Sequence, residues 1–387
     1  MTETVKPLAG LKVVELARIL AGPWIGQCLA DLGATVIKVE SPDGDDTRTW
    51  GPPFIEHESG CSAAYFHAAN RGKRSITLDF TQDEDKAVLL SLLDEADILI
   101  ENFKVGSLAK HGLDHDSLSI RNPRLITCSV TGFGQTGPWA HRAGYDVMIQ
   151  AMSGIMDLTG AADGPPQKMG VAFADIFTGL YGVIGIQAAL AERTRTGAGR
   201  HIDMALYDSM IGVLGNQAMN VLASGMAVTR MGNAHPNIVP YQDFPALDGH
   251  LIIACGNDRQ FERLCDVLEL GEAVLQDHRT NAQRVAQRAT LIPLINDQTR
   301  RFPRDTLLAQ LELAGIPAGP INTVREAVRS EQARARNLVI EPDGIPGLRM
   351  PLRFTDADLH PGTRAPGLNE HGDRIRHALA CGSSGFD

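Results

Sequence analysis

The sequence lacks the motifs that mark a metal centre or a disulfide framework. Its 6 cysteines are scattered without a CxxC pair, and its 12 histidines form no HExxH motif. This pattern favours reduced thiols over disulfides and argues against the common zinc sites. We therefore expect no structural or catalytic metal, and a cytoplasmic location.

The chain also lacks an excess of positive charge and a long apolar run. Its formal net charge is −10, whereas a protein that binds duplex nucleic acid needs a broad basic face. No continuous apolar stretch approaches the ~20 residues that cross a bilayer. The opening MTETVKPLAG has no basic region followed by an apolar one, as a secretory signal would. We expect neither a nucleic-acid nor a membrane partner, while a small anionic ligand remains open.

The first half of the sequence alternates between short apolar runs and helical patterns. Helical stretches such as 24–32 and 84–95 separate the apolar runs. The predicted strands are 12–16, 35–40, 75–79, 97–100 and 124–130. Strands separated by helices pair in parallel, with helices on both faces. We expect an α/β fold with an open parallel Rossmann-like sheet, whose ligand lies beyond the carboxyl ends of the strands.

The character of the sequence changes near Gly225. The segment 243–256, DFPALDGHLIIACG, predicts a hairpin with Asp248-Gly249 at its turn, and helical stretches follow it. The expected division is a large α/β domain at 1–225, a smaller α+β domain at 226–323, and a linker and C-terminal segment at 324–387 that returns to the large domain.

A glycine-rich motif, GFGQTG at 132–137, offers one hypothesis for the chemistry. It satisfies GxGxxG and follows a predicted strand, as a dinucleotide fingerprint does. However, Pro138 and Trp139 follow it where the fingerprint would open a helix, and the strand is not the first one. A nicotinamide-dependent dehydrogenase is therefore an alternative function that titration with NADH would test.

Asp175 offers a second hypothesis. It stands among small and apolar neighbours at the start of a helical pattern over 175–195. Its structural interpretation is an N-cap, which accepts hydrogen bonds from free backbone amides. Its functional interpretation is a nucleophile, because a helix N-terminus favours an ionised carboxylate by ~0.3–1 kcal/mol. Ala174 and Gly179 would leave room for a bulky thioester.

Basic residues on predicted loops offer a third hypothesis, the binding of an anionic ligand. Such side chains can contact the phosphates of a small anionic ligand, and arginine suits two-pronged binding of a carboxylate. They are Arg18, Arg48, Arg71, Lys73, Arg74, Lys104, Lys110 and Arg142.

Taken together, the motifs make the chain recognisable. It resembles the class III CoA-transferase family, which includes formyl-CoA transferase, carnitine CoA-transferases and α-methylacyl-CoA racemases. The matches cover nearly the whole chain and include LAGLKVVEL, AGPW, LADLGATVIKVESP, NRGKRSITLD, ADILIENFKVGSL, TGFGQTGP and ADIFTGLYG. GDDTRTWGPPF, RAGYD and HPNIVPYQ look most like the branch that uses succinyl-CoA and dicarboxylic acids such as glutarate. The resemblance implies an interlocked homodimer that binds acyl-CoA and carboxylic acids as substrates, with no permanently bound cofactor.

The resemblance also implies residue roles. Asp175 matches the nucleophile that forms an aspartyl-CoA thioester by way of a mixed anhydride, and covalent catalysis of this kind divides one difficult exchange into easier steps. Formyl-CoA transferase has glutamine where this chain has Leu20. The implied contacts with coenzyme A fall on Leu20, Ala21, Lys73, Arg74, Asn102, Phe103, Lys104, Lys110 and Arg142. The implied substrate contacts fall on Arg71 first, then on Arg18, Arg48, Tyr145, Asp146, His235 and Tyr241.

Two alternatives remain within this resemblance. Racemases of the family pair His with Asp at position 145, whereas this chain has Tyr145-Asp146. Because tyrosine has a reference pKa near 10, it is a poor base at neutral pH, which favours transfer over racemisation. A non-catalytic CoA-binding protein would keep the ligand but form no acyl-enzyme. The sequence does not identify the groups that stabilise an oxyanion.

Overall fold

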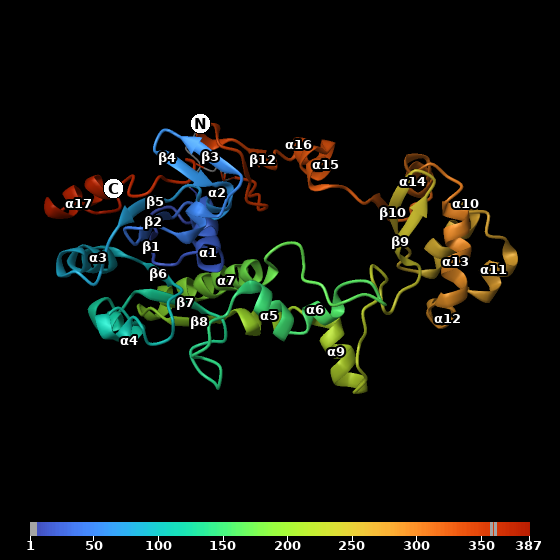
Figure 1. Ribbon diagram of the computed structural model, residues 1–387, viewed down its shortest axis with the longest axis horizontal. Helices are drawn as coiled ribbons and strands as arrows, with labels where there is room; N and C mark the ends of the chain where they lie inside the picture. Colours follow the sequence, from blue (N-terminus) through green and yellow to red (C-terminus); the bar gives the residue numbers. More distant parts are fainter. Residues whose placement is uncertain (1–5, 357–358, 360–361) are drawn as a thin grey trace. The chain divides into compact units, whose positions relative to one another are not determined.

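The computed structural model describes residues 6–356, 359 and 362–387, and its chain forms two compact units (Figure 1). The first unit comprises Met1–Ile155, Lys168–Ser224 and Glu331–Asp387, and the second comprises Met156–Gln167 and Gly225–Ser330. The chain passes into the second unit after Ser224 and returns to the first at Glu331, whereas the sequence pattern placed these changes after 225 and 323. Residues 156–167, which the sequence pattern placed in the large domain, belong to the second unit instead.

A six-stranded sheet forms the centre of the first unit, and all of its neighbouring strands pair in parallel. The strand order is β5-β2-β1-β6-β7-β8. The strands are β1 (Lys12–Glu15), β2 (Thr35–Glu40), β5 (Arg74–Thr77), β6 (Ile98–Glu101), β7 (Ile126–Thr131) and β8 (His201–Ala205). This confirms the predicted open parallel α/β sheet.

Helices cover both faces of this sheet. Val13 and Val14 are both fully buried, and successive strand residues point to opposite faces. Val13 packs in one apolar cluster with α1 (Ala21–Asp31), α7 (Phe173–Thr196) and α8 (Leu206–Gly212). Val14 packs in another with α3 (Asp83–Glu95), α4 (His115–Arg121) and α17 (Gly372–Ala380). Burial on both faces explains why the strands read as continuous apolar runs.

Two helices follow β8 in the sequence. They are α8 and α9 (Gly215–Ser224), and Gly215, the first residue of α9, has a φ of 53°. Other elements of this unit are β3 (Phe54–His57), β4 (Gly60–Ala63), α2 (Ala64–Asn70), α5 (Asp146–Met152), α16 (Glu331–Ala335), β12 (Val339–Ile340) and β13 (Gly347–Leu348).

Helix α7 has the length and composition of a membrane span. Its 24 residues contain an 18-residue window with a mean hydropathy of 1.4, although the sequence has no continuous apolar run of that length. The core helix of a water-soluble sheet protein passes the same test, so this is weak evidence for a span. In this structure α7 packs against α1 and the parallel sheet.

The second unit has its own core around an antiparallel sheet of order β11-β10-β9. The predicted hairpin is confirmed: β9 (Tyr241–Ala246) pairs with β10 (Gly249–Ala254). The remaining elements are α6 (Ile155–Leu158), α10 (Asp258–Val267), α11 (Glu272–Asp277), α12 (Asn281–Ala286), α13 (Arg288–Thr299), α14 (Arg304–Leu313), β11 (Ala318–Pro320) and α15 (Val324–Arg329).

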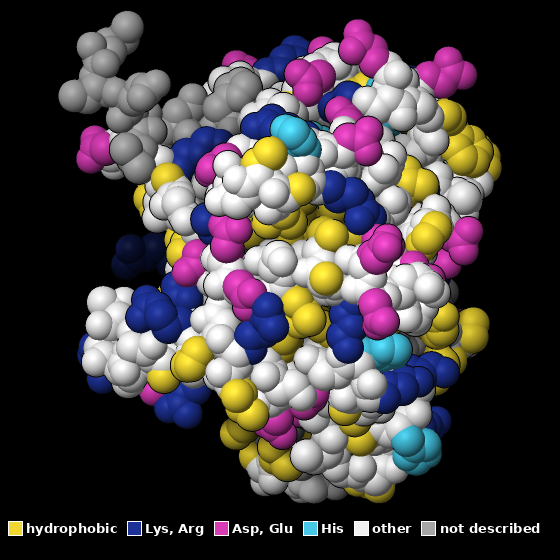
Figure 2. Space-filling model, turned by 90° about the vertical axis from the view of Figure 1, so that its left-hand side faces the viewer, with side chains coloured by type: hydrophobic (Ala, Val, Ile, Leu, Met, Phe, Trp, Pro, Cys, Tyr) yellow, Lys and Arg dark blue, Asp and Glu magenta, His cyan; other side chains and the backbone are white. Residues whose placement is uncertain are grey.

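Charges of both signs share the molecular surface. On the face that Figure 2 turns to the viewer, Lys and Arg side chains are interspersed with Asp and Glu. No continuous basic track crosses that face.

Candidate active site

A cavity of about 200 Å³ lies at the carboxyl ends of the central strands and contains Asp175 in its wall. Its lining comes mainly from the end of β7 and from the segments after β1 (18–21), β6 (102–105) and β7 (132 and 140–146). Strands β1 and β6 are neighbours, and the chain proceeds from them towards opposite edges of the sheet. Ligands of open α/β sheets bind at such a reversal of strand order.

Asp175 lies in the first turn of α7, and its residue surface is 9% exposed. Burial raises the pKa of its carboxyl group to about 7, and the negative charge of Asp146 contributes to this increase. The N-cap of α7 is Ala172, which makes no side-chain capping bond. The structural interpretation of Asp175 as an N-cap is therefore wrong for this helix.

Asp146 occupies the helix N-terminus that the sequence assigned to Asp175. Its Oδ1 accepts hydrogen bonds from the backbone amides of Ala174, at 2.8 Å, and Asp175, at 3.4 Å. Its Oδ2 accepts a bond of 2.7 Å from the buried Gln150. The free amides at the start of α7 thus form hydrogen bonds with the Asp146 carboxylate. The negative charge of Asp146 in turn contributes to the raised pKa of Asp175. The expectation that the helix N-terminus keeps Asp175 ionised is corrected accordingly.

Tyr65 on α2 is a residue that the sequence reasoning missed. Burial raises the pKa of its phenol to about 12, and the charges of Asp175, Asp146 and Asp45 add to the effect. The phenol therefore stays protonated and can donate a hydrogen bond. Nothing in the local sequence, SAAYFHAAN, signals this position, because Asp175, whose charge acts on Tyr65, lies more than a hundred residues away in the sequence.

The GFGQTG motif forms a close backbone contact rather than a dinucleotide cradle. A Cβ atom on Gly132 would lie 2.5 Å from the Cα of Gly144, and the reverse contact would be 2.4 Å. This approach brings the loop after β7 against the AGYD segment, directly before α5. The next helix begins only at Asp146. The motif lacks the strand–turn–helix context that the nicotinamide alternative requires.

The cavity brings together most of the residues predicted around Asp175. Their side chains differ in exposure, since Leu20 and Ala21 are buried, whereas Lys104, Arg142 and Tyr145 are exposed. The predicted residues in its lining are Arg18, Leu20, Ala21, Asn102, Phe103, Lys104, Arg142, Tyr145, Asp146 and Asp175.

Arg71 and Lys73 lie inside the fold instead. The Arg71 guanidinium is buried and forms an ion pair of 2.6 Å with Asp31. The Lys73 ammonium is fully buried, pairs with Glu15 at 2.8 Å and donates to Asn70. Because neither side chain lines this cavity, the structure does not support their predicted substrate and CoA contacts.

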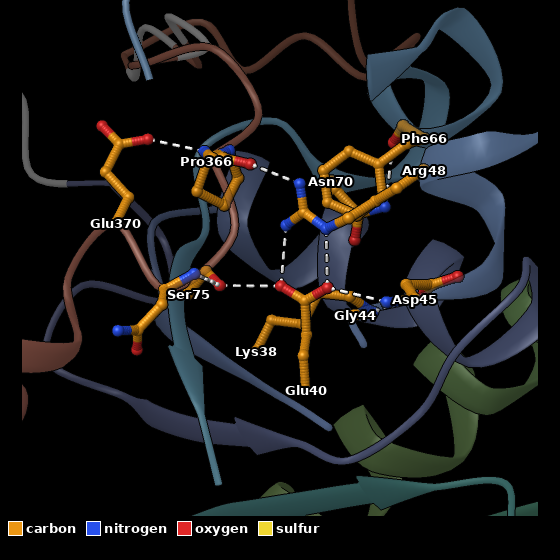
Figure 3. Close-up of polar contacts among 12 residues, drawn as sticks. Lys38, Glu40, Gly44, Asp45, Arg48, Phe66, Asn70, Ser75, Pro366 and Glu370 are labelled. Carbon is orange, nitrogen blue, oxygen red and sulfur yellow. Dashed lines mark hydrogen bonds and ion pairs between the residues drawn. The ribbon is translucent and has the colours of Figure 1, made fainter. Parts of the chain in front are cut away.

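Arg48 and Arg74 are also engaged elsewhere. Arg48 forms a two-pronged pair with Glu40 and lies 3.8 Å from the centre of the Phe66 ring (Figure 3). Arg74 donates to the backbone oxygens of Phe386 and Asp387 at the end of the chain. These arginines connect segments distant in the sequence, so their geometry points to a structural role.

The other predicted residues outside the cavity are Lys110, His235 and Tyr241. Lys110 is exposed on the short 3-10 helix Ala109–His111. His235 and Tyr241 belong to the second unit, where their rings lie 5.2 Å apart. Their roles stay predictions.

Known proteins give an independent view of the chain. The sequence pattern described as CoA-transferase family III matches residues 8–372. The succinate–glutarate CoA-transferase of Agrobacterium fabrum is 52% identical over 375 residues, 94% of either chain. The acetyl-CoA:oxalate CoA-transferase of Acetobacter aceti is 40% identical over 98% of this chain and 99% of its own.

A solved structure agrees with the sequence comparison. The crystal structure of a CaiB/BaiF family protein from Brucella suis is 63% identical, with a TM-score of 0.88 over 96% of this chain and 99% of its own. Since the family pattern covers nearly the whole chain, including Asp175 and the loops of the cavity, this protein belongs to CoA-transferase family III.

Proposed function

We propose that this enzyme transfers coenzyme A from succinyl-CoA to a dicarboxylic acid of the glutarate class. Relatives named for succinate or succinyl-CoA and glutarate support this choice at 52% identity in Agrobacterium fabrum and 39% in Mus musculus. The observation that carries it in the structure is a single buried carboxylate, Asp175, facing a cavity at the carboxyl edge of the sheet.

The proposed reaction begins when the Asp175 carboxylate attacks the thioester carbonyl of succinyl-CoA. The carbon–sulfur bond breaks, and CoA thiolate leaves with the bonding electrons, giving a mixed anhydride. The thiolate then attacks the Asp175 carbonyl of that anhydride and releases succinate, which leaves an aspartyl-CoA thioester. The acceptor carboxylate repeats the steps in reverse order, so the exchange needs no net proton.

The pKa of Asp175 suits this chemistry. Near neutral pH a carboxyl group with a pKa of about 7 is ionised in about half of the molecules. A carboxylate of higher pKa is also a stronger nucleophile than that of an ordinary aspartate.

The coenzyme A molecule would extend beyond this cavity. Lys104 and Arg142 supply exposed positive charge at its lining. A second cavity of about 300 Å³ shares Arg18 and Phe103 with the first and also contains Phe80. We assign the acyl group to the cavity with Asp175 and the nucleotide end to this second cavity.

We also propose that the protein is a homodimer, interlocked as the family resemblance implies. Ile184 on α7 is 62% exposed and Leu222 on α9 is 78% exposed, and α9 has no buried residue within the chain. Apolar surface of this kind favours a protein partner, and a second copy would cover it. Light scattering that gives a monomer at micromolar concentration would contradict this. A cytoplasmic location remains a proposal from the reduced cysteine pattern.

The proposed function is tested by incubating the protein with succinyl-CoA and separate dicarboxylic acids, and following new acyl-CoA by chromatography. Glutaryl-CoA is the expected product with glutarate. The racemase alternative predicts exchange of the α-proton of a 2-methylacyl-CoA with deuterium oxide instead. Deuterium exchange without any transfer would overturn the proposal.

A further inference from the structure

The turn between β1 and α1 contains a backbone conformation that its sequence does not favour. Ile19 has a φ of 73°, a left-handed conformation that β-branched residues rarely adopt. The residue lies in the lining of the active-site cavity between Arg18 and Leu20. Such an outlier persists only where the surrounding structure enforces it.

Side chains from three other segments hold the polar groups of this turn. Lys38 Nζ donates a hydrogen bond of 2.8 Å to the carbonyl oxygen of Ala17, and the amide of Arg18 donates one of 3.1 Å to Asn102 Oδ1. Asn102 Nδ2 donates a hydrogen bond of 2.7 Å to the carbonyl oxygen of Arg18. The amide of Ile19 donates to both carboxylate oxygens of Asp45, at 3.3 and 3.2 Å.

The two charged members of this set are themselves fixed. Lys38 and Asp45 are buried and pair at 2.9 Å, and Lys38 also pairs with Glu15 at 3.2 Å. Thr47 donates its amide and hydroxyl to Asp45. The amide of Asp45 donates to Glu40, whose carboxylate is held by Arg48 and Ser75 (Figure 3).

The turn leads directly to α1, which packs against α7, the helix that carries Asp175. Leu20 is the N-cap of α1, and the first turn of α1 packs on α7 at Gly179. A Cβ atom on Gly179 would lie 3.1 Å from the Ala21 carbonyl oxygen and 3.0 Å from the Trp24 ring. Gly179 is four residues after Asp175, on the same helix face. The start of α1 thus packs closely on the helix that carries the nucleophile, and the turn and Asp175 line the same cavity.

We propose that Lys38, Asp45 and Asn102 are positioning residues that hold Ile19 left-handed and so fix the turn 17–21 against Asp175. This gives Asn102 a role in binding the protein backbone, in place of the side-chain contact with coenzyme A predicted from the sequence. The inference rests on the proposed transferase function, because its readout is the transfer rate.

The test compares single and double variants in the succinyl-CoA and glutarate assay. Asp45→Asn weakens the hold on Ile19 and is expected to lower kcat by roughly ten- to a hundredfold, with a smaller change in KM. Adding Ile19→Gly should recover at least about threefold of that loss, because glycine adopts the left-handed conformation without help. If the double variant is no better than Asp45→Asn, the proposal is overturned.

Two controls separate positioning from general stability. Asp31→Asn removes another buried carboxylate from an ion pair, the one with Arg71, but does not touch the turn, so kcat should persist. An equal loss of kcat there would contradict the proposal. If Asp45→Asn does not fold, Asn102→Leu removes the bonds to Arg18 without leaving a buried charge, and the same rescue by Ile19→Gly is expected. If the wild-type protein transfers no CoA, the proposed function is wrong. If the wild type is active but Ile19→Gly does not rescue Asp45→Asn, the positioning role of Lys38, Asp45 and Asn102 is wrong.

Discussion

Replacing Asp175 by Asn should stabilise the first unit while it removes activity, and the gain should depend on pH. The folded protein holds this carboxyl at a pKa of about 7, against an ordinary value of 3.8. Between these values the folded state binds a proton that the unfolded state has lost, so wild-type stability falls as pH rises towards 7. Asparagine has the same shape without the charge.

The magnitude follows from the shift. A change of about 3 pKa units corresponds to about 4 kcal/mol at pH 8. At pH 5 only the part between 3.8 and 5 has been lost, about 1.6 kcal/mol. The advantage of Asp175→Asn over wild type should therefore be larger at pH 8 than at pH 5 by roughly 2–3 kcal/mol. Comparing the two pH values removes the other effects of the asparagine side chain on stability, because those effects are the same at both.

Urea unfolding followed by tryptophan fluorescence measures this quantity. The 3 tryptophans, Trp24, Trp50 and Trp139, all lie in the first unit, so the signal reports the unit that contains Asp175. Asp208→Asn replaces an exposed carboxylate on α8 and serves as the control, with the same difference from wild type at both pH values. An Asp175→Asn advantage that does not change between pH 5 and pH 8 would refute the reasoning.

The remaining predictions concern activity and packing. The rate of transfer at low acyl-CoA should fall as pH decreases through about 7, because protonated Asp175 cannot attack the thioester. Asp146→Asn should move that fall to lower pH by removing a neighbouring negative charge. An unchanged pH profile would exclude Asp146 as a cause of the raised pKa of Asp175. Arg71→Ala should cost about 3–5 kcal/mol of stability by leaving Asp31 unpaired, with no change in acceptor preference in an acceptor screen; altered preference would restore Arg71 as a substrate ligand. Gly132→Ala should cost about 1–3 kcal/mol and reduce transfer because its Cβ meets Gly144, whereas Gly212→Ala meets nothing within 4 Å and should be nearly neutral in both measurements.

The parallel sheet could be predicted because its strands are apolar on both faces. The run 35–40 matches β2 throughout, since Ile37 and Val39 are buried on one side and Val36 on the other. The separation of α8 from α9 near Val213 was not apparent from the sequence, because Gly212 and Gly215 were its local signals and glycines also occur inside helices. A hairpin with Asp-Gly at its turn was visible because its turn chemistry is local.

The candidate site was predictable only where motif and cavity coincide. Loops that follow β1, β6 and β7 met as the topology requires, which placed Arg18, Asn102 and Arg142 around one space. The buried ion pair of Arg71 with Asp31 was not predictable. The two residues are forty positions apart, and charged residues in a sequence are ordinarily expected at the surface. The left-handed Ile19 had no signal at all, since tertiary contacts alone impose it.

Mass spectrometry of the protein after incubation with succinyl-CoA tests the central claim most directly. The account predicts a CoA adduct on the peptide that contains Asp175, which hydroxylamine removes and which does not form in Asp175→Asn. Active transfer with no adduct on that peptide, or an adduct that persists in the variant, would contradict it.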